Sequence, residues 1–311
     1  REALPQTTRV YYAQGSHLCL DRVEDLSKKP NDRLSEAVAI AARSELVILA
    51  VGLDQSIEGE EMPDSKLKTC GDKPDLLLPE GQRALITAIG KTGVPTIIVN
   101  MSGSAIDLAD GNDYAKAIIQ AWYPGAEGGR AVAQLIFGDY SPSGRLPVTF
   151  YHNDEELPAF TDYRMASRTY RFRQQKPLYP FGYGLSYTRF AYSGLRVEVS
   201  DEKPVRAFVT VQNTGDREGD EIVQAYVHLE KAEVPVPLRT LAAFRRVSLR
   251  PGESREVELP LMPSTLCVYE DDGTRRTHRG SVRLWVGGRQ PDERSRELTG
   301  TNVLETVFEL S

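Results

Sequence analysis

The chain has 311 residues, which at roughly 100–200 residues per domain corresponds to two domains. Its 38 basic and 44 acidic side chains give a formal net charge of −6, without the basic excess that nucleic acids and membrane surfaces attract, so we expect neither as a partner. The cysteines Cys19, Cys70 and Cys267 are scattered and the four histidines lie far apart, so we expect no disulfide framework, metal site or cofactor. No signal peptide is recognisable after Arg1, which leaves a cytoplasmic and a secreted location both open.

Residues 1–150 alternate between strand-like and helix-like segments. The run Leu46–Leu53 is continuously apolar, which is typical of a strand buried on both faces. The segment Pro79–Gly90 begins with proline and ends with glycine, as many helices do. Such alternation predicts an α/β sandwich domain with a mostly parallel sheet and helices on both faces. The other predicted elements are strands at Thr8–Tyr12, Thr96–Asn100 and Lys116–Ala121 and helices at Arg33–Ala42 and Gly125–Phe137.

The pattern changes after residue 150. Residues 151–188 are rich in Pro, Tyr, Arg and Gly and show neither a helical nor a strand period, so we expect an ordered connector. Residues 189–311 show short alternating segments between turn residues, which predicts a small antiparallel, immunoglobulin-like β-sandwich. Its expected strands are Leu195–Val199, Val205–Gln212, Glu221–Leu229, Arg255–Leu261 and Ser281–Val286, with a hairpin turn at Tyr269–Gly273 and an edge strand within Thr301–Ser311.

A long acidic loop, Asp54–Glu80, follows the apolar run that ends at Leu53. In open parallel sheets ligands bind beyond the carboxyl ends of the strands, and a loop this long in a compact domain is usually functional or disordered. Three interpretations stay open: a solvated acidic loop, a calcium site unlike an EF-hand in spacing, or a glutamate that exchanges a proton with a bound ligand. The carboxylates in the loop are Asp54, Glu58, Glu60, Glu61, Asp64, Asp72, Asp75 and Glu80.

The sequence lacks the motifs of other common enzyme classes. It has no G-x-x-x-x-G-K-[ST] phosphate loop, and the turn Asn100–Ser104 is not the G-x-S-x-G turn of a serine hydrolase. Trp122 follows a predicted strand, where it either packs in the core or lines a sugar site.

Several blocks of the sequence resemble glycoside hydrolase family 3, and they occur in the family's order. They extend from about Thr8 to Glu258, so the resemblance covers most of the chain, and several ordered blocks are more specific than one motif. In the last domain they resemble the family's fibronectin type III-like module. The blocks are Val51–Glu60, Leu76–Gln82, Trp122–Gly129, Gly138–Pro147, Arg168–Phe172, Tyr179–Thr188, Val211–Gly215 and Leu249–Glu253.

The resemblance implies an exo-acting, retaining β-glycosidase that releases terminal sugars from a β-linked oligosaccharide or glycoside. Members carry a nucleophilic carboxylate on a preceding (β/α)8 barrel and an acid/base glutamate on the α/β domain. Glu58 stands where this acid/base falls, with Glu60 and Glu61 as the alternatives if the loop is registered differently. The sequence around Glu58 and at Arg168–Phe172 more closely resembles the β-xylosidase branch than the β-glucosidase branch.

The chain also departs from the family pattern. A barrel alone needs about 250 residues, so we expect it on polypeptide outside these 311 residues, as an intramolecular partner of this chain. A retaining mechanism needs two carboxyl groups about 5–5.5 Å apart, so the chain alone is expected to be inactive. Without the barrel we also expect a nearly ordinary pKa for the exposed Glu58 carboxyl. A β-glucosidase and a non-catalytic carbohydrate-binding or interaction module are the alternatives.

Overall fold

The computed structural model describes residues 3–18, 32–54, 75–159, 161–200 and 204–311. The chain divides into two compact units. Unit 1 consists of residues 1–137 and 151–154, and unit 2 consists of residues 138–150 and 155–311. None of the helices that the structure describes combines the length and apolar character needed to span a bilayer.

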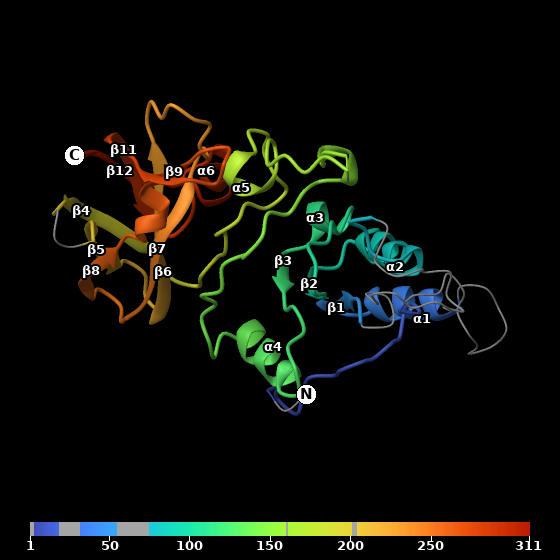
Figure 1. The fold of residues 1–311 in the computed structure, drawn as a ribbon. Coiled ribbons are helices and arrows are strands. Elements are labelled where there is room, and N and C mark those ends of the chain that lie inside the picture. Colours follow the sequence, from blue (N-terminus) through green and yellow to red (C-terminus); the bar gives the residue numbers. More distant parts are fainter. Residues whose placement is uncertain (1–2, 19–31, 55–74, 160, 201–203) are drawn as a thin grey trace. The chain divides into compact units, whose positions relative to one another are not determined.

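Unit 1 is built on a parallel three-stranded sheet in the order β1-β2-β3. In Figure 1, α1 and α2 lie on one side of this sheet and α4 lies on the other. The predicted α/β class with a parallel sheet is therefore confirmed. The strands are β1 (Val47–Gly52), β2 (Thr96–Met101) and β3 (Ala117–Gln120), and the helices are α1 (Asp32–Ala41), α2 (Glu80–Gly90), α3 (Gly111–Tyr114) and α4 (Gly128–Phe137).

The core of unit 1 lies between the sheet and α2. Leu85, Ile86 and Ile89 are spaced three and four residues apart, so they form one buried face of α2. They pack in one cluster with Leu49 of β1 and Ile98 of β2. Burial of each such side chain stabilises the fold by about 1.5–3 kcal/mol, so this packing holds α2 against the sheet.

Two predictions about unit 1 are wrong. Residues 8–12 form no strand, because a strand needs a hydrogen-bonded neighbour and none lies beside this segment in the described structure. Tyr12 in this segment is 84% exposed. The strand β1 is not buried on both faces, since Leu49 lies in the core while Ile48 is 49% exposed. An apolar run does not distinguish a central strand from an edge strand, and β1 is at the edge of the described sheet.

Unit 2 is an antiparallel sandwich of a four-stranded sheet, β12-β11-β6-β7, and a three-stranded sheet, β4-β5-β8, which confirms the predicted class. Its core is made of small branched side chains such as Val209, Val223 and Leu284. The main strands are β4 (Phe190–Glu198), β5 (Arg206–Asn213), β6 (Gly219–Leu229), β7 (Thr240–Leu249), β8 (Ser254–Pro260), β11 (Gly280–Gly287) and β12 (Leu304–Leu310). A hairpin, β9 (Cys267–Tyr269) and β10 (Arg275–Thr277), the helices α5 (Thr169–Phe172) and α6 (Glu293–Thr299) and a short 3-10 turn at Pro263–Leu266 complete the unit. A second 3-10 turn, Asp154–Glu156, begins at the last residue of unit 1 and ends in unit 2.

A buried polar network holds the segment 138–150 against β6 within unit 2. The Arg145 guanidinium lies 3.0 Å from a Glu221 carboxylate oxygen, and the two side chains are 9% and 5% exposed. Arg145 also donates to the Gly288 carbonyl oxygen, and Gln224 donates to the same oxygen and to that of Gly182. Burial raises the pKa of the Glu221 carboxyl, an effect that Arg145 opposes.

Candidate active site

The three strands of unit 1 are parallel, so their carboxyl ends meet at one edge of the sheet. β1 ends at Gly52, β2 at Met101 and β3 at Gln120. Asp54, the last described residue before position 55, lies half-buried just beyond the end of β1. This is the edge at which open α/β sheets bind their ligands, and the acidic loop begins there.

The ends of β1 and β2 approach each other closely at Gly52. Gly52 has φ +149°, and a Cβ placed on it would lie 1.9 Å from the Met101 carbonyl oxygen. A side chain has no room there, so glycine is required. Leu53 N–H then donates to the same Met101 oxygen at 2.8 Å, which keeps the two strand ends paired.

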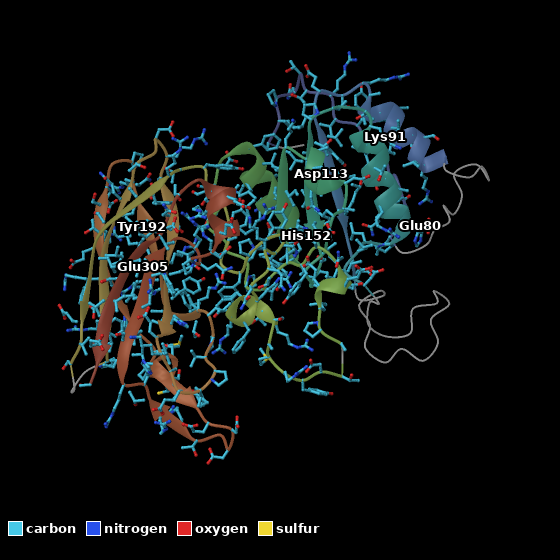
Figure 2. All side chains as sticks on the ribbon, turned by 90° about the horizontal axis from the view of Figure 1, so that it is seen from above. Glu80, Lys91, Asp113, His152, Tyr192 and Glu305 are labelled. Carbon is cyan, nitrogen blue, oxygen red and sulfur yellow. The ribbon has the colours of Figure 1, made fainter. Side chains whose placement is uncertain are left out.

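The side chain of Gln82, in the first turn of α2, is 3% exposed and holds the end of β1. Its Oε1 accepts from Gly52 N–H at 2.8 Å, and its Nε2 donates to the Gly52 oxygen at 2.7 Å and to the Leu18 oxygen at 2.6 Å. Figure 2 shows Glu80 and Lys91 at the two ends of α2, and Gln82 lies near the Glu80 end. The first turn of this helix is thereby fixed to the sheet edge.

A second polar group links the ends of β2 and β3. Asn100 Nδ2 donates to Gln120 Oε1 at 2.7 Å and to Ser102 Oγ at 3.0 Å, and Gln120 Nε2 donates to the Ser102 carbonyl oxygen at 3.1 Å. Asn100 is 1% exposed and Ser102 is 0% exposed. The two Nδ2 bonds and the Gln120 bond hold the three side chains together at this edge, while Asn100 Oδ1 is buried without a hydrogen-bond partner in the described structure.

Ser102 is not arranged as a nucleophile. Its hydroxyl donates to the Ser104 carbonyl oxygen at 3.0 Å, and a nucleophilic serine instead needs a base as its hydrogen-bond acceptor. The Ser102 hydroxyl is therefore not set up for serine-hydrolase chemistry. In the described ranges, no group of three or more His, Cys, Asp or Glu side chains is placed to hold a metal ion.

Trp122 follows β3 at the same edge. Its φ of +56° is unusual for a residue with a large side chain, and Ala121 N–H before it donates to the Asn100 oxygen at 2.8 Å. The Trp122 side chain is half-buried.

The predicted acid/base Glu58 and its alternatives Glu60 and Glu61 lie outside the described residues. The structure describes the residues from which their loop leaves and to which it returns, Asp54 and Asp75. Gln82, Asn100 and Gln120 were not singled out from the sequence. A signal existed for the last two, because each is an amide at the end of an apolar strand run, TIIVN and AIIQ.

A hollow of about 260 Å³ lies in unit 2 beside the start of α6. Its carboxylates already have structural roles. Asp292 accepts from Ser295 N–H at 2.9 Å as the N-cap of α6, and Glu293 lies 3.0 Å from Lys176. Two carboxyl groups free to act on a glycosidic bond are therefore not found among the residues that line this hollow.

Two family models match the chain. Residues 4–187 match the glycosyl hydrolase family 3 C-terminal domain, and residues 221–290 match the fibronectin type III-like domain. The first match covers more than half of the chain and includes all of the sheet edge described above.

Curated relatives carry glycosidase names. The chain is 38% identical over 280 residues to a xylan 1,4-beta-xylosidase of Xylanibacter ruminicola, covering 89% of this chain and 32% of that protein. It is 30% identical over 314 residues to a periplasmic beta-glucosidase of Salmonella typhimurium, covering 92% and 40%. The chain thus spans about a third to two fifths of the relatives it matches.

Solved structures show the same fold. A β-glucosidase from Erythrobacter marinus matches with a TM-score of 0.78 and 30% identity over 98% of this chain and 41% of its own. A family 3 β-glucosidase from Bifidobacterium adolescentis matches with a TM-score of 0.75 and 28% identity, covering 93% and 42%. With these matches and the two family models, the chain belongs to glycosyl hydrolase family 3, of which it contains the C-terminal domain and the fibronectin type III-like domain.

Proposed function

We propose that the complete protein is an exo-acting, retaining β-glycosidase that releases terminal sugars from β-linked oligosaccharides or glycosides. In this proposal the chain supplies the general acid/base, Glu58, and a preceding (β/α)8 barrel supplies the nucleophile. The relatives support a longer protein, since the chain spans only 32–40% of the first two. The observation that carries the proposal is that Asp54, four residues before Glu58 in the sequence, lies just beyond the carboxyl end of β1.

The proposed chemistry divides two roles between two carboxyl groups. The barrel carboxylate attacks the anomeric carbon and forms a glycosyl-enzyme intermediate, while Glu58 protonates the departing oxygen. Glu58, then ionised, takes a proton from the water that hydrolyses the intermediate. Donating a proton near neutral pH requires a raised pKa, which burial of the Glu58 carboxyl against the barrel or a neighbouring carboxylate would supply.

The sugar preference we propose is xylose rather than glucose. It rests on the sequence around Glu58 and Arg168–Phe172 and on the 38% identity to a protein named xylan 1,4-beta-xylosidase. β-Glucosidase activity is the second candidate, favoured by the name and 30% identity of the Salmonella typhimurium protein.

We expect the complete gene product to hydrolyse aryl β-xylosides with a kcat/KM at least about tenfold higher than aryl β-glucosides, which corresponds to about 1.4 kcal/mol in transition-state binding. The 311-residue chain alone serves as the control and should release no aryl alcohol. The reverse preference would assign the protein to the β-glucosidase branch. Turnover by the chain alone would place a nucleophile within these 311 residues, against the proposal.

The site assignment has its own test within the acidic loop. Glu58→Gln in the complete protein should lower kcat on substrates with poor leaving groups by at least about 10²-fold, because protonation of the leaving oxygen is lost. Glu60→Gln and Glu61→Gln are matched controls from the same loop and should each cost less than about tenfold. The same large loss in either control variant instead of Glu58→Gln would move the acid/base to that residue.

A further inference from the structure

The Gln82 side chain does at the edge of the sheet what a neighbouring strand does elsewhere. Its amide oxygen accepts from Gly52 N–H at 2.8 Å and its amide nitrogen donates to the Gly52 oxygen at 2.7 Å. One side-chain amide thus satisfies both the donor and the acceptor of one buried residue, which is the pattern of a backbone ladder.

The direction of these bonds follows from the pairing of β1. Leu53 N–H points toward β2, where it donates to the Met101 oxygen at 2.8 Å. Because backbone groups alternate in direction along a strand, those of Gly52 point to the opposite side, and no strand borders β1 there in the described part of the sheet. Without Gln82 the buried N–H and C=O of Gly52 would lack partners.

The same position is fixed from the other side. The missing side chain at Gly52 lets the Met101 oxygen approach, and the third bond of Gln82, to the Leu18 oxygen at 2.6 Å, ties the segment 15–18 to the same point. Gln82 is itself held on α2, whose buried face packs on the sheet. The end of β1 therefore has one position and one direction.

We propose that Gln82 is a positioning residue for the acid/base: it fixes the end of β1 from which the chain continues through Leu53 and Asp54 toward Glu58. The inference rests on the proposed function of Glu58. Gln82 touches no reacting atom in this role. It fixes the point at which the loop begins, and a general acid displaced by about 1 Å loses much of its efficiency.

The chemistry of the side chain makes the proposal specific to an amide. Gln82→Met keeps the length and volume of the side chain but offers Gly52 neither a donor nor an acceptor. Gln82→Glu keeps the acceptor for Gly52 N–H but, when ionised, directs a carboxylate oxygen at the Gly52 and Leu18 oxygens. When protonated, the same side chain regains one donor, so its defect should lessen at low pH.

The test compares leaving groups in the complete protein. The dinitrophenolate of a dinitrophenyl glycoside can leave without being protonated, whereas the alkoxide of an alkyl glycoside needs a proton from the general acid. In Gln82→Met we expect kcat/KM to fall about 10–100-fold for the alkyl glycoside and less than about threefold for the dinitrophenyl glycoside. The Gln82→Glu defect, relative to wild type at each pH, should shrink as the pH falls. Gln134→Met, at an exposed glutamine of α4, is the matched control and should leave kcat/KM unchanged for both substrates.

The outcomes separate this inference from the proposed function. Absence of β-glycosidase activity in the wild type, or full activity in Glu58→Ala, would contradict the proposed function itself. An active wild type with a Glu58→Ala defect, but with equal losses on both substrates in Gln82→Met, would contradict the positioning role alone. If circular dichroism showed both Gln82 variants unfolded at every pH, the positioning role would also be contradicted, because Gln82 would then be needed for the stability of the whole fold.

A readout without activity is available in the 311-residue chain. The amide hydrogen of Gly52 should exchange slowly in the wild type, because it is buried and bonded to Gln82 Oε1. In Gln82→Met its exchange should accelerate by at least about tenfold, while the amide of Ile98 in the middle of β2 stays unchanged. Equal protection of Gly52 in both proteins would show that Gln82 does not hold this strand end.

Discussion

At the end of β1, the backbone of Gly52 needs both a positive φ and an empty Cβ position. Gly52→Ala should therefore lower the free energy of unfolding by at least about 2 kcal/mol, because strain and a clash with the Met101 oxygen add. Gly93→Ala is the control: its φ of +71° is also positive, but no atom lies within 4 Å of the added Cβ. Urea unfolding should give a distinctly lower midpoint for Gly52→Ala. Equal midpoints would mean that the strand ends separate without cost.

Tyr114 makes the stability of unit 1 depend on pH at the alkaline end. Its hydroxyl donates to the Ile86 oxygen at 2.8 Å, and burial, aided by the Asp110 charge, raises its pKa from 10 to about 12. A raised tyrosine pKa means that folding favours the neutral phenol. This contribution is complete below pH 10 and is lost as the pH rises from 10 to about 12.

Tyr114→Phe should remove that loss, so its urea midpoint should fall less than that of the wild type between pH 10 and 12. The signal at 222 nm in circular dichroism suits this measurement, because α1, α2 and α4 of unit 1 contain most of the helical residues that the structure describes. Tyr12→Phe, at an 84% exposed tyrosine, should follow the wild type. A wild-type pH dependence in Tyr114→Phe would assign the effect to another group.

At the scale of elements, the Arg145–Glu221 pair joins the segment 138–150 to β6. Removing one partner leaves the other charge buried and unpaired, so Arg145→Met should cost about 3–5 kcal/mol in unfolding free energy. Arg145→Met combined with Glu221→Leu should recover part of that loss. Arg255→Met breaks an exposed pair with Glu253 and should cost less than about 1 kcal/mol. Similar losses for Arg145→Met and Arg255→Met in thermal unfolding would contradict the importance of burial here.

Elements whose apolar residues follow a helical or strand period over at least part of their length were predictable from the sequence. β5 and β6 alternate over part of their length, with continuous buried runs at residues 207–209 and 223–227, and α2 carries buried apolar residues three and four apart. β7 was missed because Ala242 and Ala243 are both buried beside a register shift at Ala225/Tyr226, which interrupts the alternation. The segment 8–12 was overpredicted, since β-prone residues do not supply a pairing partner.

The sequence predicted at which edge of the sheet the candidate site lies, but not the hydrogen bonds that hold it together. The carboxyl edge of a parallel sheet follows from the strand runs and a general rule of α/β folds. The three bonds of Gln82 join residues 30 and 64 positions apart, and no local pattern contains such a contact. The role of Glu58 came from resemblance to a family and remains a prediction.

At the scale of the whole molecule, the chain combines two compact units with different tasks in our account. Unit 1 presents the sheet edge, and unit 2, whose carboxylates at the hollow hold α6 and Lys176, contributes structure. The chain spans about a third of the xylosidase relative, so the second carboxyl group of a retaining mechanism is expected on the rest of the protein. Catalysis is therefore a property that we assign to the complete polypeptide.

The most direct test of this account is the product that Glu58→Ala forms in the complete protein with a dinitrophenyl glycoside and azide. Without a general base the glycosyl-enzyme intermediate should accumulate, and azide, a small nucleophile that needs no base, should restore turnover and yield the β-glycosyl azide. An α-glycosyl azide would contradict the retaining mechanism, and an unimpaired Glu58→Ala that azide does not accelerate would contradict the acid/base role of this residue.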